Sequence, residues 1–177
     1  TATAAQKNIL WAATLAGPYV STDGGATWAA KGAGLPGGQI ANTGFDSNNV
    51  AYAAAPDGVY KSTTADYQSW QKLPGLPKLN HLIVRGTDVW AATNSYGIFK
   101  YQAGTTPTWV ATNQGLPSNL VYKNAILRID PLNTSGMYVG MWGQGVYYFD
   151  GTSWTPRNNG LVGDALKIRF MSTMADR

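Results

Sequence analysis

Short apolar and aromatic runs alternate with glycine-containing turns along the whole chain. The run at 9–13, Ile-Leu-Trp-Ala-Ala, is followed by a turn at Gly17 and by a second run that ends at Val20. β-Branched and aromatic residues favour strands, and turn residues about every eight to twelve positions separate short strands from one another. The pattern therefore predicts an all-β protein and excludes the helical repeats of comparable length.

The pattern is a repeat of four units. Each unit has a strand with a central aromatic residue, a turn with glycine, a second strand, a hairpin that closes at Trp, and a Gly-Leu pair. The closing tryptophans recur about every 42 residues and are Trp28, Trp70, Trp109 and Trp154. After each Gly-Leu pair comes a further strand-like segment, at 40–45, 81–84, 125–129 and 165–170.

Four short strands in about 42 residues is the period of one β-propeller blade. We expect one propeller domain, 1–177, of four blades, each a four-stranded antiparallel sheet, with units at about 8–35, 36–76, 77–116 and 117–161. The chain starts with the second strand of a unit and ends after a lone first strand, within 162–171. Strand 165–170 is therefore predicted to pair with the N-terminal blade and to close the ring, which would remove an exposed sheet edge. A fragment of a larger ring and an open half that pairs with a second copy are the alternatives.

Composition narrows the classes of partner. Only 12% of the 177 residues are charged, and the net charge of +4 comes from Lys and Arg residues that are scattered along the chain. No basic cluster can follow a phosphate backbone, so we expect no nucleic-acid partner. No apolar run approaches the roughly 18 residues that a membrane span needs. The absence of cysteine excludes disulfides and thiolate metal sites.

One stretch matches a known repeat motif. Residues 21–28, Ser-Thr-Asp-Gly-Gly-Ala-Thr-Trp, fit the pattern Ser/Thr-x-Asp-x-Gly-x-x-Trp/Phe at every defining position. This resembles the Asp-box, or bacterial neuraminidase, repeat, which builds propellers in sialidases, xyloglucan-degrading glycosidases, sortilin-like receptors and the photosystem II assembly factor. Segments 113–119 and 146–154 also resemble regulator-type propeller repeats. The resemblance implies a propeller located outside the cytoplasm (extracellular, periplasmic or cell-surface), but these propellers carry unrelated activities.

The Asp-box is expected to be scaffold. The corresponding stretch at 62–70 lacks the glycines, that at 101–109 lacks Asp, and that at 149–154 is shortened. A structural turn tolerates such departures, because its Asp only accepts backbone N–H bonds while the Trp packs beneath it. We therefore assign structural roles to Ser21, Asp23, Gly25 and Trp28, and expect Trp28 to lie in the core with the other repeated tryptophans.

Catalytic sites are not expected. The sialidase resemblance implies an arginine triad and a tyrosine assisted by Glu, yet all nine acidic residues are Asp. A glycosidase needs two facing carboxylates, one with a raised pKa. Only Asp57 and Asp164 lie in loops that share one face of a propeller, and neither has a further partner in the sequence. His81 is the only histidine, so we also expect no metal site and no cofactor.

A ligand would sit on the face around the tunnel mouth. The turns between second and third strands and the connections between blades reach this face, which would carry Asp57, Asn94, Tyr96, Trp142, Gln144 and Asn119. Large aromatics beside amide side chains suit stacking on a sugar ring or holding a protein loop. The alternative is that Tyr96 and Trp142 both pack inward against the neighbouring blade.

The sequence thus predicts a non-catalytic module that binds a protein or a glycan, or that serves in assembly. One alternative is a fragment of a larger Asp-box glycoside hydrolase. Another is a structural subunit that oligomerises through open blades. A closed ring predicts a monomer, whereas an open ring predicts a homo-oligomer.

Overall fold

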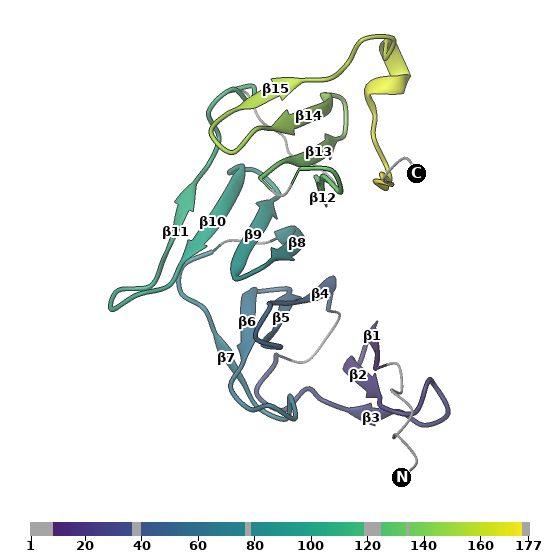
Figure 1. Cartoon of the computed structure of the whole chain (residues 1–177), viewed down its shortest axis with the longest axis vertical. Coiled ribbons are helices and arrows are strands. Elements are labelled where there is room, and N and C mark those ends of the chain that lie inside the picture. Colours follow the sequence, from purple (N-terminus) through teal and green to yellow (C-terminus); the bar gives the residue numbers. More distant parts are fainter. Residues whose placement is uncertain (1–8, 37–39, 77–78, 119–124, 134, 175–177) are drawn as a thin grey trace.

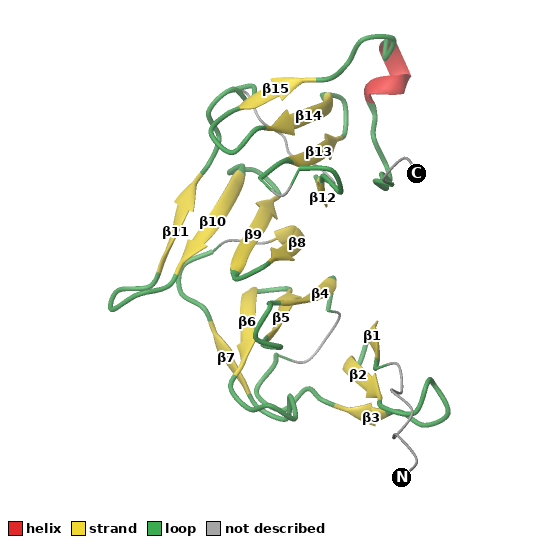
Figure 2. Ribbon diagram, in the orientation of Figure 1, coloured by secondary structure: helices red, strands yellow, loops and turns green. Residues whose placement is uncertain are grey.

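The computed structural model of the chain describes residues 9–36, 40–76, 79–118, 125–133 and 135–174. These residues form fifteen strands and one short 3₁₀ helix, η1 (Gly163–Leu166) (Figures 1 and 2). By sheet, the strands are β1 (Leu10–Thr14), β2 (Gly17–Ser21) and β3 (Ala29–Ala30); β4 (Asn42–Phe45), β5 (Ala51–Ala55), β6 (Gly58–Ser62) and β7 (Trp70–Lys72); β8 (Leu79–Arg85), β9 (Asp88–Thr93), β10 (Ile98–Gln102) and β11 (Thr108–Ala111); and β12 (Ile126–Ile129), β13 (Met137–Met141), β14 (Gly145–Phe149) and β15 (Trp154–Pro156). The described residues contain no helix with the length and hydropathy that crossing a bilayer requires.

Each sheet is an antiparallel meander whose strands lie side by side in chain order. The second, third and fourth sheets have four strands each, and the first has three. In Figure 1 the four sheets follow one another along an arc, with β1, β4, β8 and β12 on its inner side and the last strand of each sheet on its outer side. This arrangement confirms the prediction of an all-β chain built from four propeller-like sheets.

Two of the tryptophans that close hairpins, Trp70 and Trp154, join their sheets to the preceding ones. The Trp70 indole Nε1 donates to the Lys31 carbonyl at 2.5 Å, and the Trp154 indole Nε1 donates to the Thr112 carbonyl at 2.6 Å. Both acceptors belong to the connection that follows the preceding sheet. A Cβ added to Gly34 would lie 2.9 Å from the Trp70 carbonyl oxygen, and the φ of Gly34 is +89°. Gly34 therefore lets the second sheet approach closely.

The core lies between successive sheets. Ala53, Ala54, Ala91 and Ala92 are fully buried, which allows close packing of the second strands of the middle sheets. Between the third and fourth sheets, the ring of Trp90 meets that of Phe149 edge-on, with centroids 5.4 Å apart. Among the repeated tryptophans, Trp70, Trp90 and Trp154 are buried, whereas Trp11 and Trp109 are partly buried.

Trp28 differs from the expected core position. Its side chain is 44% exposed, so the prediction that Trp28 belongs to the core is wrong. The physical reason is the absence of a neighbour. Trp70 and Trp154 are buried against the sheet that precedes theirs, whereas no sheet precedes the first one among the described residues. In Figure 1 this sheet lies at one end of the arc.

The segment predicted to close the ring also differs. Residues 163–166 form η1, and Lys167 makes only an isolated bridge, with Trp142. Ile168 lies over Gly140, and the Thr173 hydroxyl donates to the Ile129 carbonyl at 2.8 Å. Residues 165–170 are therefore not a strand, and no described residue of this segment pairs with β1. The segment instead packs on the fourth sheet, where Gly140 and Gly145 leave room for the side chains of Ile168 and Leu166.

Candidate functional site

The β9–β10 turn presents an aromatic side chain to solvent. Tyr96 is 65% exposed, so the inward alternative is wrong for this ring. Its backbone is nevertheless fixed, because its N–H donates to the Thr93 hydroxyl at 3.0 Å and its carbonyl accepts from the Asn113 amide at 3.1 Å. The Thr93 hydroxyl in turn donates to the Gly97 carbonyl at 2.9 Å. Half-buried Asn94 belongs to the same turn.

The β13–β14 turn is held in the same way but is covered. Asn158 Nδ2 donates to the Gln144 carbonyl at 3.1 Å, and its Oδ1 accepts from the Val146 N–H at 2.7 Å. The half-buried Trp142 ring lies under the guanidinium of Arg169, which is 5.0 Å from the ring centroid. The segment that follows η1 therefore occupies the surface that Trp142 was expected to offer.

Asn113 and Asn158 are structural residues that sequence reasoning missed. Asn113 Oδ1 accepts from the Ile98 N–H at 2.8 Å, as Asn158 does from Val146. A Cβ at Gly97 or Gly145 would collide with the matching carboxamide, and both glycines have positive φ. The signal was present in the sequence, because each Asn stands two residues before a Gly-Leu pair.

Asp57 and Asp164 are engaged in ion pairs. Lys72 Nζ lies 2.6 Å from Asp57 Oδ2, and the Tyr60 hydroxyl donates to the same carboxylate at 3.0 Å. The hydrogen bond from Lys72 lowers the pKa of Asp57, with a smaller lowering by Tyr60. Asp164 pairs with Lys167 at 2.6 Å. The lowered pKa makes Asp57 a poor general acid.

The predicted ligand-face residues that the structure describes lie on three turns, with Asn94 beside Tyr96 and Trp142 beside Gln144. Within the described part of the chain, no hydrogen bond or ion pair joins the turns of Asp57, Tyr96 and Gln144. Asn119 lies outside the described residues. Tyr96 is the aromatic residue of this set that is open to solvent on a fixed turn.

The Asp-box turn closes on itself. Asp23 Oδ1 accepts from the Ser21 hydroxyl at 2.7 Å and from the Thr27 N–H at 2.9 Å, and its Oδ2 accepts from the Thr27 hydroxyl at 2.6 Å. The Gly25 N–H donates to the Ser21 hydroxyl at 2.8 Å. These bonds, those from Thr27 above all, hold the pKa of Asp23 well below its usual range. Both oxygens of the Asp23 carboxylate thus accept hydrogen bonds from residues of the turn itself.

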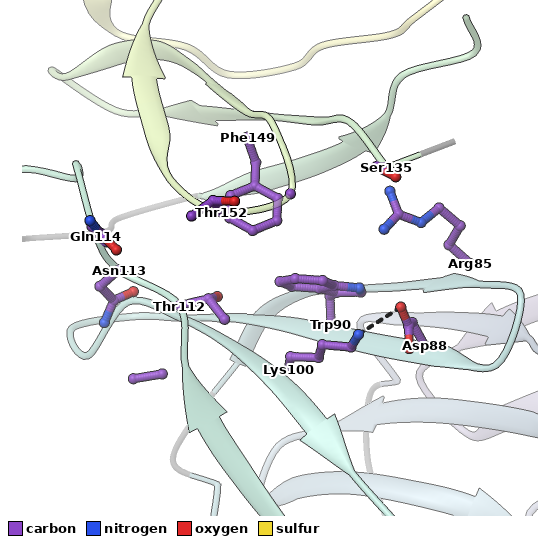
Figure 3. A pocket seen from close by; sticks show the side chains of 12 residues that line it. Arg85, Asp88, Trp90, Lys100, Thr112, Asn113, Gln114, Ser135, Phe149 and Thr152 are labelled. Carbon is purple, nitrogen blue, oxygen red and sulfur yellow. Dashed lines mark ion pairs between the residues drawn. The ribbon is translucent and has the colours of Figure 1, made fainter. Parts of the chain in front are cut away.

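A cleft between the third and fourth sheets was not predicted. Its volume is about 430 Å³, and Figure 3 shows the side chains around it. The strand register assembles it, because Lys100 pairs with Trp90 across β9 and β10 while Arg85 pairs with Asp88 across β8 and β9. Lys100 Nζ lies 2.8 Å from Asp88 Oδ2, and Arg85 Nη1 donates to the Gly136 carbonyl at 3.1 Å. Sequence reasoning could not place these charges together without knowing the register.

His81 lies partly buried on β8. Its Nε2 lies 3.2 Å from Arg128 Nη1. Burial, together with the charge of Arg128, lowers the pKa of His81 to about 4, so the imidazole is neutral at pH 7. The described residues contain no group of three His or Asp side chains that could hold a metal ion.

Comparison with known proteins gives structural matches only. No family model matches the chain, and no curated protein matches it by sequence. The GH74 xyloglucanase from Xanthomonas campestris superposes with a TM-score of 0.57 at 19% identity, over 78% of this chain and 21% of that one. The Niastella koreensis GH74 enzyme gives 0.61 at 22% identity, over 83% and 22%. YCF48 bound to a D1 peptide gives 0.54 at 15% identity, over 85% and 50%.

These matches bear on fold alone. The chain spans about a fifth of the length of the two GH74 enzymes and half of that of YCF48. Identities this low carry no shared activity or ligand. All three are β-propeller proteins, and this chain is built from β-propeller blades of the same kind.

Proposed function

We propose that the chain is a non-catalytic β-propeller module that binds a protein or a glycan through the face that carries Tyr96. The observation that carries the proposal is the exposed Tyr96 ring on a turn whose backbone is fixed by Thr93 and Asn113. An aromatic ring on a preorganised turn provides contact area with little loss of conformational entropy on binding.

The state of the carboxylates supports a non-catalytic role. Each described aspartate has a hydrogen-bond or ion-pair partner. Glycoside hydrolysis needs one carboxyl group that stays protonated and a second that is free to act on the sugar or on water. The competing hypothesis, a fragment of a larger glycoside hydrolase, predicts that Asp57→Asn and Asp164→Asn reduce turnover, whereas a binding module keeps its affinity in both variants.

The two ligand classes are both represented among the structural matches. One match is a xyloglucanase, and another is bound to a peptide. A location outside the cytoplasm, which the Asp-box resemblance implies, is part of the same proposal.

The test is a binding screen with matched variants. The chain is screened against a glycan array that includes xyloglucan oligosaccharides and against a displayed peptide library. For any ligand retained, Tyr96→Ala should weaken affinity about tenfold or more, which is about 1.4 kcal/mol, while Tyr96→Phe keeps most of it. Phe170→Ala is the control, because Phe170 is also an exposed ring but lies on the segment that covers the fourth sheet. Hydrolysis of a glycan that stops in Asp57→Asn would contradict the proposal.

Pairing through open blades is a second candidate. The first sheet exposes Leu10 and Trp28, whose counterparts on the fourth sheet, Met137 and Trp154, are buried between sheets. Light scattering across a range of concentrations tests it. A mass that rises with concentration, and that Trp28→Ser returns to that of one chain, supports pairing, whereas a constant monomer mass contradicts it.

A further inference from the structure

Trp90 in the cleft between the third and fourth sheets carries a buried N–H without an acceptor. Its side chain is 3% exposed, and its Nε1 has no hydrogen-bond partner in the described structure. Trp70 and Trp154, in contrast, donate their Nε1 protons to carbonyls. A buried donor left unpaired is costly and calls for an explanation. In Figure 3 the nitrogen end of the indole points to the side of the cleft where Arg85 and Asp88 lie.

The groups around this N–H are mostly donors. Arg85 and Lys100 both line the cleft, against a single carboxylate, Asp88. Asp88 forms an ion pair with Lys100. Arg85 donates one hydrogen bond, from Nη1 to the Gly136 carbonyl, and its other guanidinium N–H groups can donate to a ligand. Two cations and an indole N–H around one anion favour an added carboxylate, because charge-assisted bonds to a carboxylate are the strong ones.

The shape of the cleft decides between an acidic peptide and an acidic sugar. A sugar ring is held by stacking on an open aromatic face, and the two rings that line the cleft, Trp90 and Phe149, are 3% and 4% exposed. They contact each other, and Lys100 Nζ lies 5.4 Å from the Trp90 ring centroid. No ring here has a free face. An acidic side chain of a peptide, which would enter the cleft with its carboxylate first, does not need a free ring face.

We propose that this cleft is a second binding site, for the carboxylate of an Asp or Glu side chain on a peptide segment. The carboxylate accepts from the Trp90 indole N–H and from Arg85, and it competes with Asp88 for Lys100. A volume of about 430 Å³ is large enough for one such side chain with its flanking backbone. The Tyr96 side chain does not line this cleft, although Asn113 borders the cleft and also holds the Tyr96 carbonyl.

The test follows the indole N–H signals of the chain by NMR. The chain has seven tryptophans, and the spectrum of Trp90→Phe identifies the Trp90 signal. The probes are N-acetyl-Gly-Glu-Gly-amide, the matched Gln peptide, and galacturonate. We expect the Glu peptide to move the Trp90 signal in a saturable way and the Gln peptide to leave it in place.

Charge variants give the effect a sign. Arg85→Gln should weaken binding of the Glu peptide about tenfold, while Asp88→Asn should tighten it severalfold because the competing anion is gone. Arg157→Gln is the matched control, since its guanidinium lies on the Tyr148 ring rather than in the cleft. Tyr96→Ala should leave this binding unchanged.

Three results with the peptides, galacturonate and the arginine variants would overturn the proposal. One is a Trp90 signal that does not move at about 10 mM Glu peptide. A single ion pair is expected to give a dissociation constant in the millimolar range, so binding should be visible at that concentration. Another is a response to galacturonate but not to the Glu peptide, which would identify an acidic-sugar site. The third is equal weakening by Arg157→Gln and Arg85→Gln, which would indicate a general charge effect. Should Arg85→Gln fail to fold, Asp88→Asn decides, and unchanged affinity in that variant is also an overturning result.

Discussion

The first and fourth sheets carry corresponding hairpins that differ in how complete the Asp-box is and in how buried its tryptophan is. The first has the complete Asp-box, with Asp23 bonded to Ser21 and Thr27, yet its Trp28 is 44% exposed. The fourth has a shortened box, yet its Trp154 is 2% exposed and donates to the Thr112 carbonyl. The completeness of the motif therefore determines the hydrogen bonding within the turn. The burial of the tryptophan depends on the neighbouring sheet.

The tryptophans provide the largest test of this comparison. Trp154→Ala should lower the free energy of unfolding by about 3–5 kcal/mol, because it removes a fully buried ring and leaves a cavity. Trp28→Ala should cost about 1 kcal/mol or less, because much of that ring is already in water. Urea unfolding of both variants measures the difference. Equal losses would mean that Trp28 is buried in solution, and the comparison would fail.

Acid should act on the third and fourth sheets before the first. The pKa of His81 is lowered to about 4 from an ordinary value of 6.5, so the folded protein binds fewer protons than the unfolded chain between these values. The stability is fully present above about pH 6.5 and is lost as the pH falls through 4, by about 3 kcal/mol at most.

His81→Asn should flatten this slope. Urea unfolding followed from pH 7 to pH 4 measures it. Because His81 on β8 lies against Arg128 on β12, backbone amide exchange should rise there rather than in β1 and β2. An unchanged slope in the variant would show that His81 is not the group that titrates.

The glycines of the Gly-Leu pairs provide a matched contrast. Gly115 has φ +87° and meets the backbone of Trp154, whereas Gly75 has φ +68° and nothing within 4 Å of an added Cβ. Alanine at either position bears the cost of a left-handed backbone, about 1–2 kcal/mol. Gly115→Ala should cost about 1–3 kcal/mol more, since the neighbouring backbone must move. Thermal unfolding of the pair measures the gap, and equal losses would show that the close approach is easily relieved.

The smallest effect is expected at Asp23. Its pKa is depressed by the bonds from Thr27 and Ser21, so its contribution is present above the ordinary Asp range and is lost as the pH falls toward its folded value. The Asp23 side chain is partly exposed, and solvent screens its charge. Asp23→Asn should therefore remove a slight acid sensitivity that is confined to the first hairpin, which NMR shifts of Gly25 and Thr27 below pH 4 would report. Global acid unfolding that disappears in this variant would contradict the local role.

The strands were predictable because their signals are local. Segments 40–45, 81–84 and 125–129 were expected as first strands, and β4, β8 and β12 occupy them. Segment 165–170 has the same alternation but packs across the fourth sheet, because Gly140 and Gly145 provide sites for its apolar side chains. Local pattern specifies the preference for a strand, and tertiary contacts decide whether it is satisfied.

The candidate sites were less predictable. The turn of Tyr96 could be placed from the repeat, but whether its ring faces solvent depends on the packing around it. The cleft beside Trp90 requires the registers of three strands and the contact between two sheets, none of which the spacing of Arg85, Asp88 and Lys100 reveals.

The short connection from Thr112 to Gly115 serves both the turn and the next sheet. Asn113 holds the Tyr96 carbonyl, while the carbonyls of Thr112 and Gln114 receive the indole and backbone N–H groups of Trp154. A load applied to a ligand at Tyr96 would thus reach the fourth sheet through four consecutive residues. In mechanical terms, the exposed turn is anchored in the neighbouring blade, so a pulling force on the ligand would be distributed over two sheets.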